Sequence, residues 1–391
     1  MSVAHAERAH ALLSASGSKR WMSCPPSAQL EQEFEEKTSE FALEGTFAHE
    51  LSELSLMLYT GDITKQVFTR RLNKAKKDQF YSEEMADYVQ VYVDLVIEKI
   101  NEVKAKTKDA VVLLEQRLDF SAWVPEGFGT GDVVLIGDGT LEVIDLKYGK
   151  GVPVSAVDNP QMKLYALGAI NQFGFLYDIE TVKMTIVQPR LDSISTDEVK
   201  ADKLLKWADE TVKPLADMAI AGSGEMNAGE HCRFCRAKAT CRARADENLK
   251  MAKFEFQEPK LLSNDEIAEI LIKADELQKW AKDVQDYAFE QAEKHGVKFP
   301  GWKLVEGRSV RKYIDEKEVA TLLTTEGYQE DDIYTKKLLG ITAMEKKVGK
   351  KKFNELLKEL VIKPNGKPTL VPESDKRTEL NSTASAVEDF K

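Results

Sequence analysis

An Asp-Gly pair between two apolar runs constrains the fold of this chain more than any other feature of its sequence. Asp138 and Gly139 separate two short runs that are rich in Val, Leu and Ile. Two such runs joined by an Asp-Gly dipeptide predict a β-hairpin with a two-residue turn. Because the turn fixes the pairing, Asp132 lies opposite Asp145 in the predicted hairpin. Lys147 shares the face of Asp145, since side chains alternate between the two faces along a strand.

The two facing carboxylates of this hairpin predict a cation site. Side chains opposite each other on paired strands have Cβ atoms about 4.5–5.5 Å apart, so Asp132 and Asp145 repel each other unless a cation lies between them. Oxygen ligands of this kind suit Mg²⁺ or Mn²⁺. Such an ion would polarise a phosphate and activate water, and Lys147 would orient that water or stabilise charge on the phosphate. The alternative is a surface hairpin with weak ion pairs.

Two further segments carry polar side chains that fit the same site. Gln161 and Tyr165 lie four residues apart on one face of the helix that follows the hairpin, and an amide with a hydroxyl can hold a phosphate or position water. His49 lies two residues from the apolar positions Phe47 and Leu51 of its helix, so it points away from that stripe. It is a candidate third metal ligand, which would favour Mn²⁺ over Mg²⁺. Taken singly, each of these residues also fits a purely structural role.

The remaining pattern predicts an α/β core with a mixed sheet flanked by helices. We expect strands at 111–115, 132–136, 141–147 and 181–187, and helices within 1–60 and at 80–106, 159–171 and 197–221. Glu115 ends the strand before the hairpin, from where it could also approach the site, but it is not assigned to it. The chain has no G-x-x-x-x-G-K-[ST] loop, so an ATP-driven motor is not supported.

The spacing of apolar residues changes after about residue 255, which predicts three parts: a domain at 1–250, a helical region at 260–361 and a loosely ordered tail at 362–391. Ser263-x-x-Glu266 is a capping box that opens a long helix with coiled-coil-like apolar spacing. Shorter helices are expected at 316–325 and 343–361.

Charge and hydropathy restrict the partners of the chain. Its 391 residues carry a formal net charge of −11, which argues against a broad, non-specific coat on nucleic acid. A nuclease remains possible, because its carboxylates recover charge balance through a divalent metal. No apolar stretch is long enough for a membrane span, and the first residues lack the apolar core of a signal peptide. We therefore expect a cytoplasmic protein without a membrane partner.

The four cysteines predict a second metal centre. Cys24 stands alone near the N-terminus, whereas Cys232, Cys235 and Cys241 fall within ten residues. Disulfides are not expected in a cytosolic protein of this size, and the close spacing points to a metal. Zinc sites draw their ligands mostly from two close pairs, so one distant and three clustered cysteines are unusual for zinc. Zinc, and four unconnected buried cysteines, are the alternatives to an iron–sulfur cluster.

The polar residues, taken in order, resemble the RecB-type branch of the PD-(D/E)XK nuclease superfamily over residues 17–245. The matching motifs are G-x-x-x-H (Gly45, His49), G-x-x-D (Gly129, Asp132), D-L-K (Asp145, Leu146, Lys147) and Q-x-x-x-Y (Gln161, Tyr165). The resemblance implies a restriction-endonuclease-like core. It implies metal binding by His49, Asp132, Asp145 and the Leu146 backbone carbonyl, a catalytic Lys147, and a site completed by Gln161 and Tyr165.

The cysteine order resembles the iron–sulfur staple of the CRISPR-associated exonucleases and of the helicase–nuclease subunit AddB. In those proteins one cysteine precedes the nuclease core and three follow it, as Cys24 precedes His49 and the other three follow Tyr165. The resemblance implies a structural 4Fe-4S cluster. Residues 262–391 are similar to the C-terminal part of a phage and prophage protein family.

These features together predict a metal-dependent DNA exonuclease of phage or prophage DNA recombination, replication or repair. Its expected partners are single- or double-stranded DNA ends, with recombination or single-strand-binding proteins as possible further partners. The alternatives are a non-catalytic iron–sulfur module that binds DNA or directs assembly, and a structure-specific endonuclease on the same fold. Several residues near the cysteines either contact DNA or form a solvated rim: His231, Arg233, Phe234, Arg236, Lys238 and Arg242. The same choice applies to the basic residues at 308–312 and 346–352.

Overall fold

The computed structural model describes residues 11–35, 39–250, 263–305, 314–334, 338–357 and 360–361. The chain divides into two compact units, residues 1–288 and residues 289–391. The division falls inside helix α10 (Asn264–His295), most of which belongs to the first unit.

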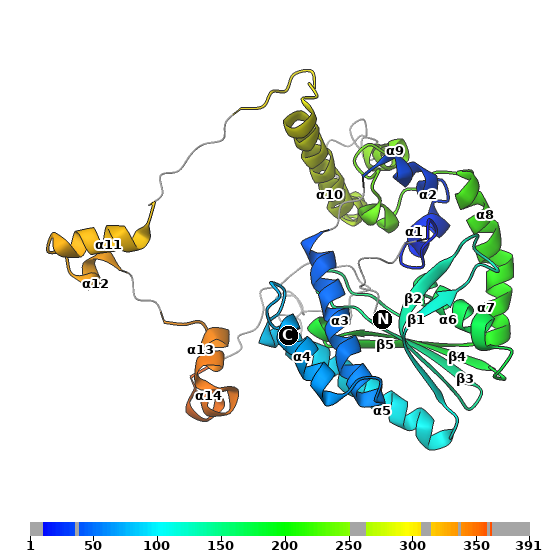
Figure 1. Cartoon of the computed structure of the whole chain (residues 1–391). Coiled ribbons are helices and arrows are strands. Elements are labelled where there is room, and N and C mark those ends of the chain that lie inside the picture. The colour runs from blue at the N-terminus through cyan, green and yellow to red at the C-terminus, as the bar shows by residue number, and fades with distance from the viewer. Residues whose placement is uncertain are drawn as a thin grey trace, which may run out of the picture. The chain divides into compact units, whose positions relative to one another are not determined.

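A five-stranded mixed sheet forms the centre of the first unit (Figure 1). Its strands are β1 (Val111–Asp119), β2 (Phe128–Gly137), β3 (Thr140–Leu146), β4 (Thr181–Gln188) and β5 (Ser193–Lys200), paired in chain order. The β3–β4 pair is parallel and the other three pairs are antiparallel. The expected α/β class with a mixed sheet flanked by helices is confirmed.

The predicted hairpin register is confirmed at the turn between β2 and β3. Gly137 pairs with Thr140, and the ladder runs regularly to Val133 and Ile144. The two turn residues, Asp138 and Gly139, have φ values of 52° and 66°. Both therefore adopt the left-handed conformation that a two-residue hairpin turn of type I′ requires.

Helices cover the sheet on both faces, and their bounds follow from capping signals in the sequence. The N-terminal helices are α1 (Ser18–Ser23), α2 (Ser27–Leu30), η2 (Glu31–Glu33), α3 (Glu40–Thr60), α4 (Lys65–Ala75) and α5 (Glu83–Lys106). The side chains of Ser39, Thr64 and Ser82 cap the last three of these. Gly61, at φ 87°, ends α3 in the left-handed conformation.

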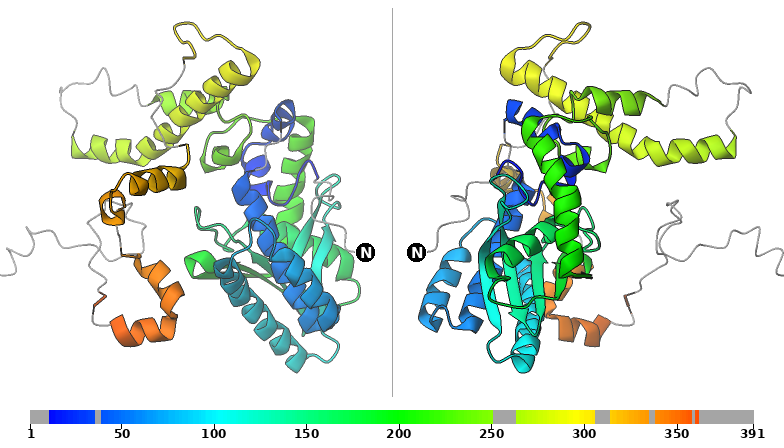
Figure 2. Two further views of the ribbon diagram at one scale, coloured as in Figure 1. Left: turned by 60° about the vertical axis from the view of Figure 1, so that its left-hand side comes forward. Right: turned by 90° about the vertical axis from the view of Figure 1, so that its right-hand side faces the viewer.

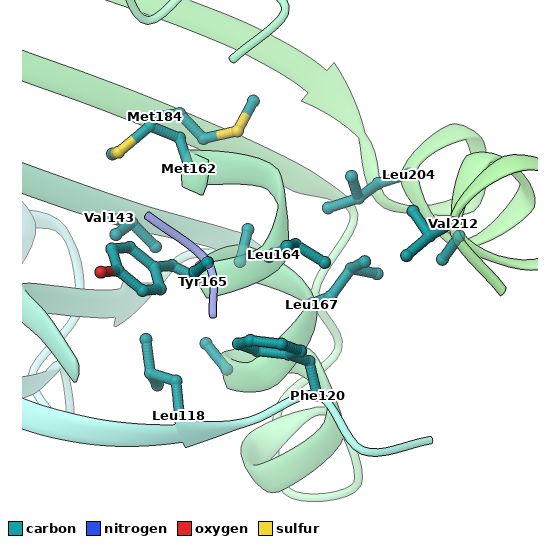
Figure 3. Close-up of a cluster of buried hydrophobic side chains, with 14 of the residues drawn as sticks. Leu118, Phe120, Val143, Met162, Leu164, Tyr165, Leu167, Met184, Leu204 and Val212 are labelled. Carbon is teal, nitrogen blue, oxygen red and sulfur yellow. The ribbon is translucent and has the colours of Figure 1, made fainter. Parts of the chain in front are cut away.

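Each face of the sheet has its own apolar core. Helix α6 (Pro160–Phe173), opened by Asn159 as N-cap, packs on one face, and Figure 3 shows Tyr165 of this helix among the buried side chains there. Helices α3 and α5 pack on the other face, where Val133 and Leu146 contribute from the sheet. Figure 2 shows the sheet between these helices.

The expected helix at 197–221 was wrong at its start, because the chain forms the edge strand β5 through Lys200. Residues of β5 alternate between half-buried and exposed, but the strand is mostly polar and carries little β signal in sequence. Pairing with β4 decides the local structure, as tertiary context commonly does for strands. The helical elements that follow are α7 (Ala201–Trp207), η4 (Ala208–Val212) and α8 (Lys213–Ala221).

The later elements include one short turn of helix at the cysteines and continue into the second unit. They are η3 (Pro189–Leu191, before β5), η5 (Glu230–Phe234), α9 (Arg242–Leu249), α10, α11 (Glu316–Thr325), α12 (Glu330–Ile333), α13 (Ile341–Val348) and α14 (Lys350–Leu357). The predicted capping box forms, since the backbone amides of Ser263 and Glu266 donate to each other's side chains.

The single helix expected at 343–361 was wrong: it is split at Gly349, whose φ is 86°. The basic run at 308–312 and the expected tail at 362–391 lie outside the described residues. Among the residues that the structure describes, no helix is long and apolar enough to cross a membrane.

Candidate metal centre and cysteine pocket

The candidate metal centre lies where the strand ladders of β1, β2 and β3 open. Pairing between β2 and β3 stops at Val133, and the backbone amide of Leu146 donates instead to Asp132 Oδ2 at 2.7 Å. The β1–β2 ladder is interrupted at one position, between the pairs on either side of Glu115 and Asp132. Glu115 has a φ of 47°, a left-handed conformation that is uncommon for a residue with a side chain. The interruption brings two carboxylates together at the opening.

The side-chain alternation of β2 changes phase at this opening. Val134 belongs to the core beneath α6, yet an added Cβ at Gly129 would also meet that core, 2.6 Å from Tyr165 Cε1. Regular alternation would place Gly129 and Val134 on opposite faces of the sheet, because an odd number of positions separates them. Both meet the same core, so the alternation is broken between them. Asp132 is therefore free to turn toward α3, where its Oδ1 lies 3.2 Å from His49 Nδ1.

Asp145 is the centre of a second set of contacts at the same opening. Its Oδ2 lies 2.9 Å from Lys147 Nζ. The amide nitrogen of Gln161 donates to its Oδ1 at 3.4 Å and to the hydroxyl of Tyr165 at 3.1 Å. Asp145 is 2% exposed, and its Oδ2 accepts no hydrogen bond of good geometry from the described residues despite the lysine nearby. All the predicted site side chains thus lie at one place, with the Leu146 amide beside them.

Glu115 is the residue that sequence reasoning left out. His49, Glu115 and Asp132 each offer a ligand atom within 4.8 Å of the others, which makes them a group able to hold a metal ion. Asp145 is not a member of that group. The only signal in the sequence was a single acid at the end of the apolar run of β1. No short turn joins β1 to β2, so the sequence could not show that Glu115 lies beside Asp132.

Burial and mutual attraction set the protonation of the site. Burial lowers the pKa of His49, but the Asp132 carboxylate outweighs it and raises that pKa to about 9. Burial also raises the pKa of Asp132, yet His49 and the Leu146 amide outweigh it and lower the pKa below its usual value. The pKa of Asp145 stays raised, because burial outweighs the attraction of Lys147.

Two buried tyrosines face these carboxylates. Burial, with Asp145 next, raises the pKa of Tyr165 far above its ordinary value, so its hydroxyl acts as a hydrogen-bond donor. Tyr92 of α5 is fully buried, and burial followed by Asp132 raises its pKa well above the usual value. Its hydroxyl has no hydrogen-bond partner among the described residues. Tyr92 lies in the apolar stripe of its helix, where sequence alone gives no sign of a polar role.

The four cysteines line one pocket, although they come from opposite ends of the domain. Cys24 follows α1, Cys232 lies in η5, and Cys241 is the N-cap of α9. The pocket has a volume of about 330 Å³, including its part open to solvent, and is also lined by Arg20, Lys238 and Arg244. The cysteines form no disulfide, and no three of their sulfurs lie within 4.8 Å of one another.

Hydrogen bonds hold the two ends of the domain together around this pocket. The buried Glu31 accepts from the Arg20 side chain at 2.7 Å and from the backbone amide of Arg236 at 2.8 Å. Burial raises the pKa of the Cys235 thiol to about 11, so the pocket keeps this thiol protonated unless a positive centre binds it. Residues 24 and 232 are thus brought together by α1, which packs against η5 and α8.

Comparison with known proteins gives a family and a likeness to a solved structure. Residues 10–378 match a sequence family described as "Protein of unknown function (DUF2800)". A solved structure titled "Crystal structure of SSO0001" is 15% identical in sequence, and the match covers 61% of this chain and 91% of that one, with a TM-score of 0.25. So low a TM-score supports no conclusion about fold or activity.

Proposed function

We propose that this chain, which belongs to the DUF2800 family, is a divalent-metal-dependent deoxyribonuclease with a RecB-type PD-(D/E)XK core. The observation that carries the proposal is the meeting of two sets of side chains at one opening of the sheet. One set, His49, Glu115 and Asp132, can hold a metal ion. The other, Asp145 with Lys147, supplies a buried carboxylate and a cation beside it.

The donor atoms of the site fit Mg²⁺ or Mn²⁺. Carboxylate oxygens are the ligands these hard cations prefer, and an imidazole nitrogen favours Mn²⁺ of the two. The buried Oδ2 of Asp145 accepts no hydrogen bond of good geometry but has the Lys147 ammonium 2.9 Å away, so it already attracts positive charge. When bound, the ion would polarise a phosphate and lower the pKa of a bound water.

The protein's own side chains orient the phosphate and the attacking water. The Lys147 ammonium lies beside Asp145 with its side chain 26% exposed, so it can reach a phosphate from the open side of the site and stabilise its developing charge. Gln161 holds Asp145 through its amide and is itself beside the Tyr165 hydroxyl. These contacts fix the carboxylate in one orientation, which a hydrolytic site requires.

We further propose that the cysteine pocket holds a 4Fe-4S cluster. A zinc ion binds four thiolates at about 2.3 Å and would hold their sulfurs about 3.8 Å apart, whereas no three sulfurs here lie within 4.8 Å. A cluster binds each thiolate through a different iron, so its ligands stand farther apart. Arg20, Lys238 and Arg244 line the same pocket, each beside a carboxylate that already pairs with it. The cluster would close a long loop of chain and so stabilise the domain.

Hydrolysis of end-labelled linear DNA tests the nuclease proposal. Wild-type protein is incubated with Mn²⁺ beside the Asp145→Ala variant and a control, Asp178→Ala, whose carboxylate lies outside the site. We expect the site variant to lose at least about 100-fold in rate and the control to lose none. Equal, negligible nucleotide release by wild type and Asp145→Ala would favour a non-catalytic DNA-binding module. Cleavage of closed circular single-stranded DNA would identify an endonuclease instead of an exonuclease.

Purification without oxygen tests the cluster. We expect a coloured protein with iron and acid-labile sulfide, and loss of both in Cys24→Ser but not in Ser23→Ala. The neighbouring serine is exposed, so its change controls for general damage to α1. A colourless protein with one zinc per chain would refute the iron–sulfur assignment.

A further inference from the structure

Helix α4 carries a concentration of positive charge that the metal centre does not explain. Six of the residues at 65–77 are Lys or Arg and none is acidic, in a chain whose net charge is −11. The exposed residues of this stretch are Lys65, Gln66, Thr69, Arg70, Asn73, Lys74, Lys76 and Lys77. We call the cations among them the α4 basic face.

The apolar side of α4 fixes the direction of this face. Leu72 and Ala75 pack against the core that α3 and α5 form on the sheet, and Val67 and Phe68 are half-buried. These positions recur at three- and four-residue spacing, so they form one stripe of the helix. The exposed cations within the helix, Lys65, Arg70 and Lys74, lie on the opposite side, and the exposed Lys76 and Lys77 directly follow its end.

The α4 basic face is not neutralised by the protein. Within the described ranges, Lys65, Arg70 and Lys77 form no ion pair, whereas lysines on the long helix α10 pair with acids four residues away. Lys76 lies 5.7 Å from the centre of the Tyr81 ring. Several like charges on one short helix repel one another, and bound anions would relieve that repulsion.

The α4 basic face adjoins the element that carries His49. Helix α4 packs along α3 (Figure 1). Helix α3 carries His49, so α4 lies against the helix that holds the candidate metal ligand.

We infer that the α4 basic face binds the phosphate backbone of DNA whose end lies in the site between α3 and the sheet. The choice of DNA rests on the proposed function. A basic amphipathic helix can also lie on a membrane, but the apolar side of α4 is packed against the protein core and is not available for lipid. Contacts from Lys and Arg to the phosphate backbone carry no sequence information, so this contact would be independent of sequence.

DNA binding at several salt concentrations tests the inference. Fluorescence anisotropy is measured with labelled duplex DNA, without metal, in the Asp145→Ala background. The α4 variant carries Lys65→Ala, Arg70→Ala and Lys77→Ala. The matched control carries Lys203→Ala, Lys206→Ala and Lys213→Ala, three exposed lysines of α7 and α8.

We expect the α4 variant to bind more weakly and with a smaller salt dependence. Each phosphate contact contributes about 0.9 to the slope of log K against log salt, so the slope should fall by roughly 2 to 3 in the α4 variant and stay unchanged in the control. An unchanged slope in the α4 variant, or an equal fall in both variants, overturns the inference. The inference is also overturned if the parent protein binds anionic phosphatidylserine vesicles, or polyglutamate, more tightly than it binds DNA.

A second readout separates this inference from the proposed function. In protein with an intact site, the α4 substitutions should lower kcat/KM for long DNA and leave hydrolysis of bis(p-nitrophenyl) phosphate unchanged, because the small diester cannot reach α4. Parent protein that binds DNA through α4 but hydrolyses neither substrate contradicts the proposed function alone. If the α4 variant hydrolyses long DNA as fast as the parent protein does, that result contradicts this inference alone.

Discussion

Metal binding at the proposed centre should release a proton from His49. A histidine must be neutral to bind a metal, but Asp132 raises the pKa of His49 to about 9 in the metal-free protein. At pH 7.5 His49 is therefore almost fully protonated. Binding of Mn²⁺ through this ring should release roughly one proton, and the apparent affinity should rise about tenfold per pH unit up to pH 9.

The same shift predicts how the metal-free protein responds to pH. Because the folded pKa of His49 lies above the unfolded value of 6.5, protonation stabilises the fold. A rise of this size corresponds to about 3 kcal/mol. That contribution is fully present below about pH 6.5 and is lost as the pH rises through 9. Urea denaturation of the metal-free protein across this pH range should show a falling free energy of unfolding. The His49→Gln variant should not show this fall.

Titration calorimetry with Mn²⁺ in two buffers of different ionisation enthalpy measures the released protons. Wild type should release about one, His49→Gln close to none, and His295→Gln, which changes an exposed histidine at the end of α10, as many as wild type. Equal proton release by wild type and His49→Gln would refute the reasoning, because another group would then supply the proton.

Three further changes test individual contacts. Gly129→Ala should destabilise the fold by about 1–3 kcal/mol in urea, since the new Cβ would lie 2.6 Å from the buried ring of Tyr165; unchanged stability would mean that the ring moves aside. Gln188→Leu should speed amide hydrogen exchange at 149–154, because the buried amide of Gln188 makes three hydrogen bonds to that loop, and equal exchange would contradict this. Arg244→Lys should expose α10 to proteases sooner, since lysine cannot replace the forked contacts of arginine with two acids of that helix; an unchanged digestion pattern would show that other contacts hold α10.

The sequence predicts best what local chemistry decides. The Asp-Gly turn set the register of β2 and β3 from Gly137 and Thr140 to Val133 and Ile144, because only a type I′ turn joins strands through two residues of positive φ, but the pairing stops before Asp132 and Asp145. Four-residue helical spacing brought Gln161 and Tyr165 to one face, and both contact the same site. These predictions depend on residues close together in the chain.

The parts that escaped prediction depend on contacts between distant residues. Glu115 reaches the site because β1 pairs with β2 across a loop without a recognisable turn, and because its own backbone takes a left-handed conformation there. Tyr92 lies on a helix whose stripe is otherwise apolar, so its orphan hydroxyl is visible only once the helix is packed on the sheet. Strand β5 is polar and exists through its pairing with β4.

The balance of charge at the opening of the sheet predicts that this centre forms before it binds a metal. Three carboxyl groups, those of Glu115, Asp132 and Asp145, meet there, and repulsion between them would oppose folding. The protein sets two cationic side chains against them, with His49 beside Asp132 and Lys147 beside Asp145. A divalent ion that displaces the His49 proton would exchange one positive charge for two and leave Lys147 for the phosphate. The proton on His49 thus supplies positive charge when no metal is bound, so we expect that the fold of this centre does not depend on the metal as a zinc finger does.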